Sequence, residues 1–301
     1  DVPVPPLDEQ KRIAEKLDTL LTRVDSCERH LERIPQIIKR FRQSVLAAAT
    51  SGRLTEEWRE VNSVNGEREE TTVGEIAEVF LGRQRSPENH FGEHMRKYVR
   101  AANITWNGWD FSDVKEMNFN PRDFEKYHLR VGDVLLNEGS GSADEVGKPA
   151  IWNGEIEDCC FQNTLLCVRP YSASPKYLYY LFLHTAMAKL FVKNVRGVNI
   201  FHIGKEKLAN FEIFLPSLEE QAEIVRRVGK LFAVAERLEA RYLSASERVA
   251  RLTPSLLAKG FRGELVEQDP NDESAEKLLE RIREAKKNAP KEVKKAIRLD
   301  V

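Results

Sequence analysis

The chain has 301 residues, with 47 lysines and arginines against 48 aspartates and glutamates, so its formal net charge is −1. That length supports one substantial core with helical additions, and the high charged fraction indicates a soluble protein. No apolar run is long enough to cross a bilayer and no signal peptide is visible, which argues against membrane-spanning and secreted proteins.

The cysteines indicate a reducing compartment. Cys159 and Cys160 are adjacent, and neither they nor Cys27 and Cys167 form a CxxC pair or a His/Cys spacing typical of a metal site. We therefore expect free thiols, no bound metal and a cytoplasmic location.

The first element is a long amphipathic helix. Its apolar residues recur at alternating steps of four and three: Ile13, Leu17, Leu20, Val24, Cys27, Leu31 and Ile34. Such a heptad seam, with charged residues elsewhere, favours a coiled coil over a surface helix that faces a globular core. Pro6 and the acidic residues after it suit a helix start, Pro35 predicts a kink or break, and Gly52 is a plausible stop.

The middle of the chain has a different character. Residues 59–70 are polar without periodicity and predict a linker. From residue 71 to 215, short β-branched and aromatic runs alternate with turn residues, which predicts a compact α+β domain. Strands are expected over 131–137, 150–152 and 161–168, and Ser174-Pro175 predicts the start of a buried helix.

The last third repeats the first. Residues 218–265 match residues 7–54 without a gap at an offset of 211, so that Gln221 matches Gln10 and Gly263 matches Gly52. The second seam has the same steps: Ile224, Val228, Leu231, Ala235, Leu238, Tyr242, Ala245, Val249 and Leu252. Two copies of one helix that bracket a domain indicate a spacer, whereas a solenoid would stack many shorter units.

These elements predict an α+β fold: one globular domain plus two long antiparallel coiled-coil helices. Each helix has one end at the globular domain, so the two run antiparallel if they pair. The expected divisions are residues 1–58 for the first helical region, 59–70 for the linker and 71–215 for the globular domain. Residues 216–265 form the second helical region, and 266–301 a Lys/Glu-rich tail with a helix near 275–285 that binds a partner or frays.

Candidate DNA contacts lie in two basic stretches, around residues 83–100 and 189–207, and in the polar segments between them. Arginine and lysine contact phosphates, and glutamine and asparagine can read adenine. Gly139–Ser142 resembles a backbone loop that approaches phosphate, although a plain tight turn is the alternative. The proposed contacts are Arg83, Gln84, Arg85, Lys97, Arg100, Asn137, Ser140, Ser142, Lys148, Gln162, Asn163, Lys193, Arg196, Asn199 and His202. For the basic stretches the alternative is a solvated surface, and for Gln162 and Asn163 it is side-chain amides that tie a turn together.

No catalytic site is evident. An Asn or Asp followed by two prolines and an aromatic, typical of amino-methyltransferases, is absent, and Asp269-Pro270-Asn271 indicates only a turn. The segment Gly141–Lys148 fails as a phosphate-binding P-loop, because Ser142 and Pro149 stand at positions that require Gly and Ser or Thr. The histidines are scattered, which is typical of structural or surface residues.

Three features together resemble a specificity subunit of a type I restriction–modification system. They are the two helical repeats, the run from Tyr127 to Ser142, and Phe161-Gln162-Asn163 before a strand. The resemblance implies a non-catalytic subunit that binds double-stranded DNA and directs adenine methylation and cleavage by others. It implies methyltransferase subunits as partners and, through them, a restriction subunit. S-adenosylmethionine, ATP and magnesium would be held by those partners, and no cofactor by this chain.

The pattern departs from the family in one respect. The complete subunit carries two target-recognition domains, each reading half of a split site, whereas this sequence shows one. The sequence leaves open a naturally short half-subunit, a subunit without its first domain, and the remnant of a longer gene; its first residues match the exit from the globular domain. A homodimer could read a palindromic site. An alternative from a different class of function is a coiled-coil scaffold whose central domain binds protein.

Overall fold

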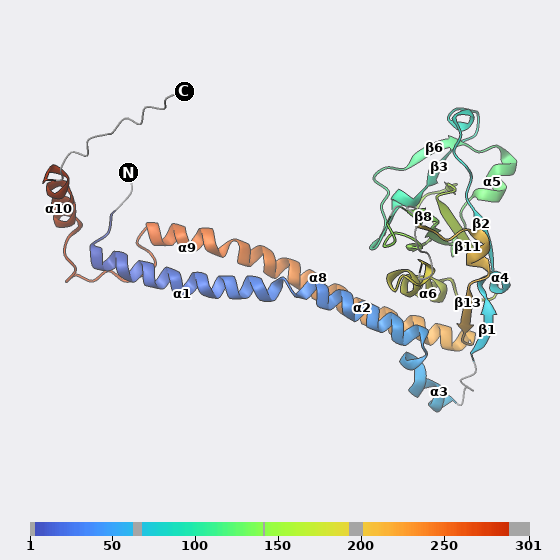
Figure 1. Cartoon of the computed structure of the whole chain (residues 1–301), viewed down its shortest axis with the longest axis horizontal. Coiled ribbons are helices and arrows are strands. Elements are labelled where there is room, and N and C mark those ends of the chain that lie inside the picture. Colours follow the sequence, from blue (N-terminus) through green and yellow to red (C-terminus); the bar gives the residue numbers. More distant parts are fainter. Residues whose placement is uncertain (1–3, 63–67, 141, 193–200, 289–301) are drawn as a thin grey trace, which may run out of the picture. The chain divides into compact units, whose positions relative to one another are not determined.

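The computed structural model describes residues 4–62, 68–140, 142–192 and 201–288 (Figure 1). The chain divides into two compact units. The first unit comprises Asp1–Ile38 and Arg237–Val301, and the second comprises Lys39–Glu236. Helices α2 (Ile34–Thr50) and α8 (Leu218–Ala250) contribute residues to both.

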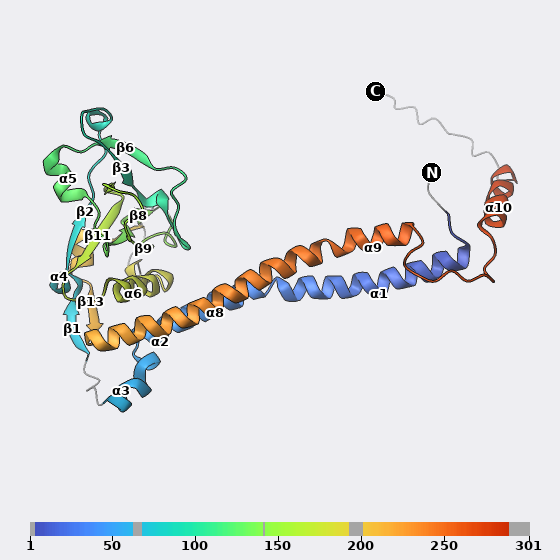
Figure 2. The same ribbon diagram turned by 180° about the vertical axis from the view of Figure 1, so that it is seen from behind.

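The first unit is helical. Helix α1 (Leu7–Leu31) lies beside α9 (Leu252–Phe261) in both views (Figures 1 and 2). The start of α1 meets the end of α9, because a Cβ at Gly260 would lie 3.1 Å from Leu17 and 3.5 Å from Ile13. The two helices therefore run antiparallel, as the repeat predicts. Arg12 binds Asp272 with both terminal nitrogens, at 3.1 and 2.6 Å, and so ties the following segment to α1.

A break interrupts the first long helix. α1 ends at Leu31 and α2 begins at Ile34, so Pro35 occupies the first turn of a new helix, where its missing N–H costs nothing. The break expected near Pro35 is confirmed. The seam itself is buried only in part: Ile13 and Val24 are buried, whereas Cys27 is exposed and Leu238 is 46 % exposed. A regular heptad pattern therefore did not ensure a continuously covered seam.

The second unit contains the globular domain, built on two sheets. The four-stranded sheet has the order β2–β11–β7–β9, with every pair antiparallel. Its strands are β2 (Ala77–Leu81), β11 (Leu165–Pro170), β7 (Val134–Asn137) and β9 (Pro149–Ile151). The three-stranded sheet has β3 (Met95–Val99) between β10 (Cys160–Phe161), which is parallel to it, and β6 (Lys115–Asn118), which is antiparallel.

Short ribbons and helices complete this unit. The two-stranded pairs are β1 (Glu69–Thr72) with β13 (Glu212–Leu215), β8 (Gly139–Ser140) with β12 (Phe201–His202), and β4 (Ile104–Thr105) with β5 (Gly108–Trp109). The helices are α3 (Glu56–Asn62), α4 (Val73–Ile76), α5 (Pro121–Tyr127), α6 (Pro175–Met187) and α7 (Lys205–Ala209). Single 3-10 turns lie at Arg53–Thr55, Pro87–Asn89, Ala101–Asn103 and Leu190–Val192. Beyond the globular domain, α10 (Ala275–Asn288) confirms a helix in the tail.

Helix α6 lies at the centre of the larger core. It packs on β9 and β7 (Figure 2), and Leu178 and Phe182 are fully buried. Ser174 caps the helix by accepting the N–H of Tyr177, and Pro175 follows the cap, as the sequence predicts. Leu46 of α2 and Ile224 of α8, also fully buried, belong to the same core. The globular domain is thus continuous with the helical ends beside it, rather than joined to them by a loose tether.

Three sequence-based boundaries were wrong. Residues 59–62 are the end of α3 and Glu69 begins β1, so the linker over 59–70 is shorter than expected. The strand expected over 161–168 is two strands, separated by a turn at residues 162–164. The strand expected from residue 131 begins at Val134, because Gly132 has φ +95° and turns the chain. The predicted strands include turn residues that lie inside apolar runs, and the structure places these residues outside the strands.

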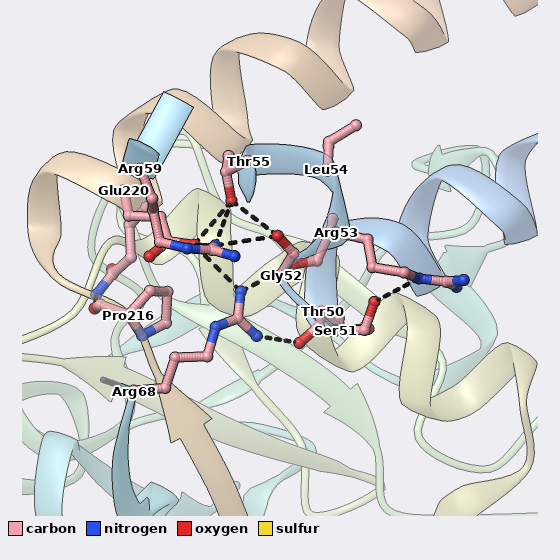
Figure 3. Close-up of polar contacts among 12 residues, drawn as sticks. Thr50, Ser51, Gly52, Arg53, Leu54, Thr55, Arg59, Arg68, Pro216 and Glu220 are labelled. Carbon is pink, nitrogen blue, oxygen red and sulfur yellow. Dashed lines mark hydrogen bonds and ion pairs between the residues drawn. The ribbon is translucent and has the colours of Figure 1, made fainter. Parts of the chain in front are cut away.

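A buried carboxylate joins the start of α8 to the end of the first helical region (Figure 3). Glu220 is 2 % exposed. Its Oε1 accepts hydrogen bonds from Thr55 (2.7 Å), Arg59 (2.6 Å) and Arg68 (3.3 Å). Arg59 also donates to the carbonyl of Gly52, at 3.0 Å. A buried charge needs several hydrogen-bond donors. Glu220 therefore holds the segments that carry Thr55, Arg59 and Arg68 against the start of α8.

Replacing Gly52 by alanine is expected to destabilise the protein. Gly52 has φ +84°, and a Cβ there would lie 2.8 Å from the Arg68 guanidinium. We expect a loss of about 1–3 kcal/mol in the free energy of unfolding, from backbone strain and displacement of Arg68. The control is Gly229→Ala in α8, where nothing lies within 4 Å of the new Cβ and a gain of about 0.5–1 kcal/mol is expected. Urea denaturation measures both, and equal effects would contradict the prediction.

Candidate nucleic-acid interface

A turn at residues 162–164 gathers three segments that are distant in sequence. The N–H of Gln162 donates to Val99 (3.0 Å), and that of Asn163 donates to the carbonyl of Arg83 (3.0 Å). Thr164 accepts the N–H of Glu138 at its carbonyl (2.9 Å). Its hydroxyl accepts the N–H of Ala101, at 3.0 Å. The turn therefore connects the segments that follow β2, β3 and β7.

Strand direction explains this convergence. β11 is antiparallel to both β2 and β7, so its beginning lies beside their ends: Leu166 faces Leu81, and Leu165 faces Asn137. Loops that leave the ends of β2 and β7 must therefore meet the turn that enters β11. Loops positioned by a rigid sheet are a common place for binding residues. We call residues 82–85, 99–101, 138–140 and 162–164 the turn cluster.

Gly82 allows the close approach inside the turn cluster. A Cβ at Gly82 would collide with the carbonyl oxygen of Gln162 and with the Phe161 ring. Arg83 then forms a parallel β-bridge with Gln162. Backbone contacts thus hold the Leu81-Gly82-Arg83 segment against the turn.

Gly82→Ala is expected to lower the free energy of unfolding by about 1–3 kcal/mol, because the new methyl group overpacks a backbone contact. It should also displace Gln162 and Asn163 and lower their affinity for any ligand that they bind. Urea denaturation measures the first effect, and a titration with the ligand measures the second. An unchanged denaturation midpoint would show that the turn can move without cost.

The turn cluster contains two side-chain amides, those of Gln162 and Asn163. Gln162 and Asn163 are half-buried, and among the described residues their side-chain amides have no hydrogen-bond partner. The turn is held by backbone hydrogen bonds and by Thr164 instead. An amide in this state can donate and accept at once, the chemistry that reads adenine.

The two arginines after β2 differ in how far their guanidinium groups are engaged by other residues of the protein. Arg83 is committed internally: it donates to the carbonyl of Asn118, to Asn89 (2.9 Å) and to Asp123 (2.8 Å). Gln84 and Arg85 are exposed. Arg85 makes one contact from its Nε to His90, at 3.2 Å. Arg83 therefore positions this loop, and Arg85 presents its charge to solvent.

The other proposed contacts are spread over three settings. Lys97 is exposed on β3 opposite Glu116 of β6, and Arg100 pairs with Asp113 at 2.5 Å. Asn137 and Lys148 are buried; the first donates to the carbonyl of Glu145 (3.3 Å), and the second pairs with the Glu145 carboxylate. Lys193, Arg196 and Asn199 lie outside the described residues. The burial of Asn137 and Lys148 therefore argues against direct contact of either side chain with DNA.

Gly139 and Ser140 form β8, one strand of a small ribbon. Ser140 pairs with Phe201, and Gly139 pairs with His202. The hydroxyl of Ser140 accepts the N–H of Ser142, at 3.1 Å, and Ser142 is exposed. His202 is exposed and contacts Glu138 at 3.0 Å. Ser140 belongs to the turn cluster, and its contact with Ser142 and the contact of His202 with Glu138 bring those two residues beside the cluster.

Sequence reasoning missed three residues of interest. Thr164 supplies the hydroxyl that fixes the turn, but a threonine within an apolar run gives little signal. Trp106, 38 % exposed, lies beside the ammonium group of Lys148, with 5.8 Å between that nitrogen and the ring centre. Phe91 is 85 % exposed in the loop before β3. The Asn-Gly after Trp106 is a hairpin signal that could have predicted the β4–β5 turn.

The described part of the chain offers no metal site. No group of three or more His, Cys, Asp or Glu side chains gathers there in a way that could hold an ion. All four cysteines are free, and burial raises the pKa of the Cys159 thiol to about 12, which keeps it protonated. Among the same described residues, no helix is long and apolar enough to span a membrane.

Comparison with known proteins identifies the family. Residues 65–244 match the type I restriction modification DNA specificity domain, and the chain belongs to that family. The specificity subunit of the type I restriction enzyme EcoKI from Escherichia coli K12 is 34 % identical over 294 residues, covering 94 % of this chain and 63 % of that protein. The StySPI specificity subunit from Salmonella potsdam is 36 % identical over 295 residues, with the same coverage. The chain thus spans less than two thirds of the length of these relatives.

Solved structures support the fold. A chain from a structure on complex assembly and conformational transition of the type I R-M system has a TM-score of 0.67 at 22 % identity, covering 87 % of this chain and 61 % of its own. The HsdS subunit from Thermoanaerobacter tengcongensis has a TM-score of 0.54 at 23 % identity, with 87 % and 60 % covered. The α+β architecture with two long helices is thereby confirmed.

Proposed function

We propose that this chain recognises DNA sequence within a type I restriction–modification complex and that its globular domain reads one half of the target. The observation that carries the proposal is the turn cluster, in a chain of the DNA specificity family. It combines two amides that are unpartnered among the described residues with the exposed Arg85, and its Ser140 hydroxyl is half-buried. Amides suit base edges, whereas arginine and hydroxyls suit phosphates.

The chain itself does no catalysis in this proposal. Methyltransferase subunits, and a restriction subunit bound through them, carry S-adenosylmethionine, ATP and magnesium, and the helices serve as their attachment surface. The similarity to specificity subunits of type I restriction enzymes supports this division of labour. A homodimer of two such readers would recognise a palindromic site.

Two measurements test the proposal. Titration with duplex DNA should give an affinity that falls steeply with salt, because lysine and arginine displace counterions from phosphates. Co-expression with cognate methyltransferase subunits should then produce methylated adenines in a defined motif, mapped across the genome. A protein-binding scaffold would show neither, and failure of both measurements would remove the DNA proposal.

A further inference from the structure

An aromatic ring stands in solvent beside the turn cluster. Phe91 is 85 % exposed, in the loop that joins β2 to β3. A single exposed apolar side chain needs no explanation by itself. What distinguishes Phe91 is that the backbone on both sides of it is fixed by hydrogen bonds, so that the loop holds the ring in a defined place.

The turn cluster holds the first half of this loop. Arg83 donates to Oδ1 of Asn89, at 2.9 Å. Arg85 donates from its Nε to Nε2 of His90, at 3.2 Å. Both arginines belong to the turn cluster, and Phe91 directly follows His90 in the chain. The backbone of Phe91 therefore lies beside the segment that carries the exposed Arg85.

The second half of the loop packs against the end of β6. The N–H of His94 donates to Oδ1 of Asn118, at 2.9 Å, and its carbonyl accepts the N–H of Phe119, at 2.8 Å. A Cβ at Gly92 would collide with the side-chain amide of Asn118, so this close approach depends on glycine. Because the loop is already ordered, contact of the Phe91 ring with a ligand would cost little conformational entropy.

The charge at the tip of the loop argues against a place on the DNA backbone. Glu88 and Glu93 flank Phe91; both are exposed, and among the described residues neither makes an ion pair. Phosphates repel carboxylates, so this tip does not suit the sugar–phosphate backbone. It suits the major groove, where cytosine N4 and adenine N6 offer hydrogen-bond donors to an acidic side chain.

The amides of the turn cluster favour the same groove. Gln162 and Asn163 suit the N6 and N7 atoms of adenine, which face the major groove. That groove displays one apolar group, the C5-methyl of thymine, and phenylalanine is among the residues that contact it. A ring held out in solvent gains free energy when it covers such a methyl group, because both surfaces leave water.

We propose that Phe91 recognises the C5-methyl group of a thymine in the half-site that the globular domain reads. The inference rests on the proposed DNA recognition and deepens it, since it assigns one residue to one chemical group of the target. Uracil and cytosine lack this methyl group and lose the contact. Phe91 is thus a specificity-determining residue, whereas Arg85 beside it supplies attraction to phosphates.

The test removes one methyl group from the DNA. Methylation mapping gives the motif, and each thymine of a fluorescent duplex that carries it is replaced in turn by deoxyuridine, which differs only at C5. Anisotropy titrations use the full chain with its cognate methyltransferase subunits. One replacement should lower the affinity about three- to tenfold. Phe91→Ala should cause a similar loss on the thymine duplex and no further loss on that deoxyuridine duplex, because both changes remove the same contact.

The matched control is Phe214→Ala. Phe214 is 59 % exposed on β13, opposite Glu70 of β1. β1 leads through α4 into the start of β2, whereas the turn cluster follows the end of β2. This substitution should change the affinity less than about twofold, with no dependence on deoxyuridine. Both phenylalanines are exposed, so each variant should melt within about 2 °C of the wild type.

Three outcomes would overturn the proposal. The first is a wild-type complex whose affinity depends on no thymine methyl group. The second is an equal loss from Phe91→Ala on the thymine and deoxyuridine duplexes, which would mean that the ring contacts something other than the methyl group. The third is failure of Phe91→Ala to assemble with the methyltransferase subunits in size-exclusion chromatography, which would place the ring in a subunit interface.

Failure of this inference is distinguishable from failure of the proposed function. Salt-dependent binding of the motif without any effect of the methyl groups would overturn the role of Phe91 and leave DNA recognition intact. Absence of a methylated motif and of duplex binding would overturn both.

Discussion

Arg85→Glu is expected to weaken the affinity for specific duplex DNA about 10- to 100-fold at 0.1 M salt. Arg85 is exposed within the turn cluster, and among the described residues its side chain makes one hydrogen bond, from its Nε to His90. A reversed charge replaces attraction to a phosphate by repulsion, and loss of one phosphate contact should reduce the salt slope by about 1. Anisotropy titrations at several salt concentrations measure both quantities.

The matched control is Arg130→Glu. Arg130 is also exposed, but it precedes β7, whereas the turn cluster adjoins the end of that strand. The same charge change there should alter the affinity less than about threefold, because only the general field of the domain changes. Equal losses at Arg85 and Arg130 would indicate attraction by net charge alone and would contradict an interface at the turn cluster.

Asp133→Ala is expected to cost about 3–5 kcal/mol in the free energy of unfolding, since it leaves a partly buried guanidinium without its counterion. Asp133 is 1 % exposed and binds Arg169 through both oxygens, at 2.8 and 2.7 Å. It also accepts the backbone N–H of Arg130 at 2.8 Å, which shapes the turn before β7. Urea denaturation of the purified chain measures the loss.

The control for this prediction is a solvent-exposed ion pair. Glu264 pairs with Arg262 at 2.7 Å, but both side chains are about half exposed, at 51 % and 55 %. Glu264→Ala should therefore change the free energy of unfolding by less than about 1 kcal/mol. If both substitutions lowered the free energy of unfolding by a comparable amount, burial would not explain the contribution of the Asp133–Arg169 pair to stability.

Local patterns predicted the helical parts well. The heptad steps predicted two long helices, Pro35 predicted the break before α2, and Gly52 and Gly263 end their helical regions with positive φ. Each of these signals depends on neighbouring residues, which are visible in a single sequence. Burial of the seam was predicted less well: Leu238 fits the heptad pattern but is 46 % exposed. Which seam positions are covered depends on the partner helix and on the breaks.

The candidate site was predicted only as separate pieces. The sequence marked Arg83, Gln84, Arg85, Gln162 and Asn163 as DNA contacts, and the structure places them in one cluster. It could not show that Arg83 is committed to Asn89 and Asp123, because those residues become neighbours only after the chain folds. The structure likewise buries Asn137 and Lys148, which the sequence had treated as surface residues.

The repeat at residues 7–54 and 218–265, the antiparallel helices and the α+β domain between them were determined by the sequence alone, because periodicity and self-similarity are properties of the chain itself. Only the tertiary structure decided that β2, β3 and β7 end around the turn at 162–164. It also decided that Glu220 is satisfied, whereas Oε1 of Glu9 has no hydrogen-bond partner among the described residues. The reason is physical: strand pairing and burial bring together residues that are far apart in sequence, and their partners determine whether a polar group holds the fold or remains free to bind.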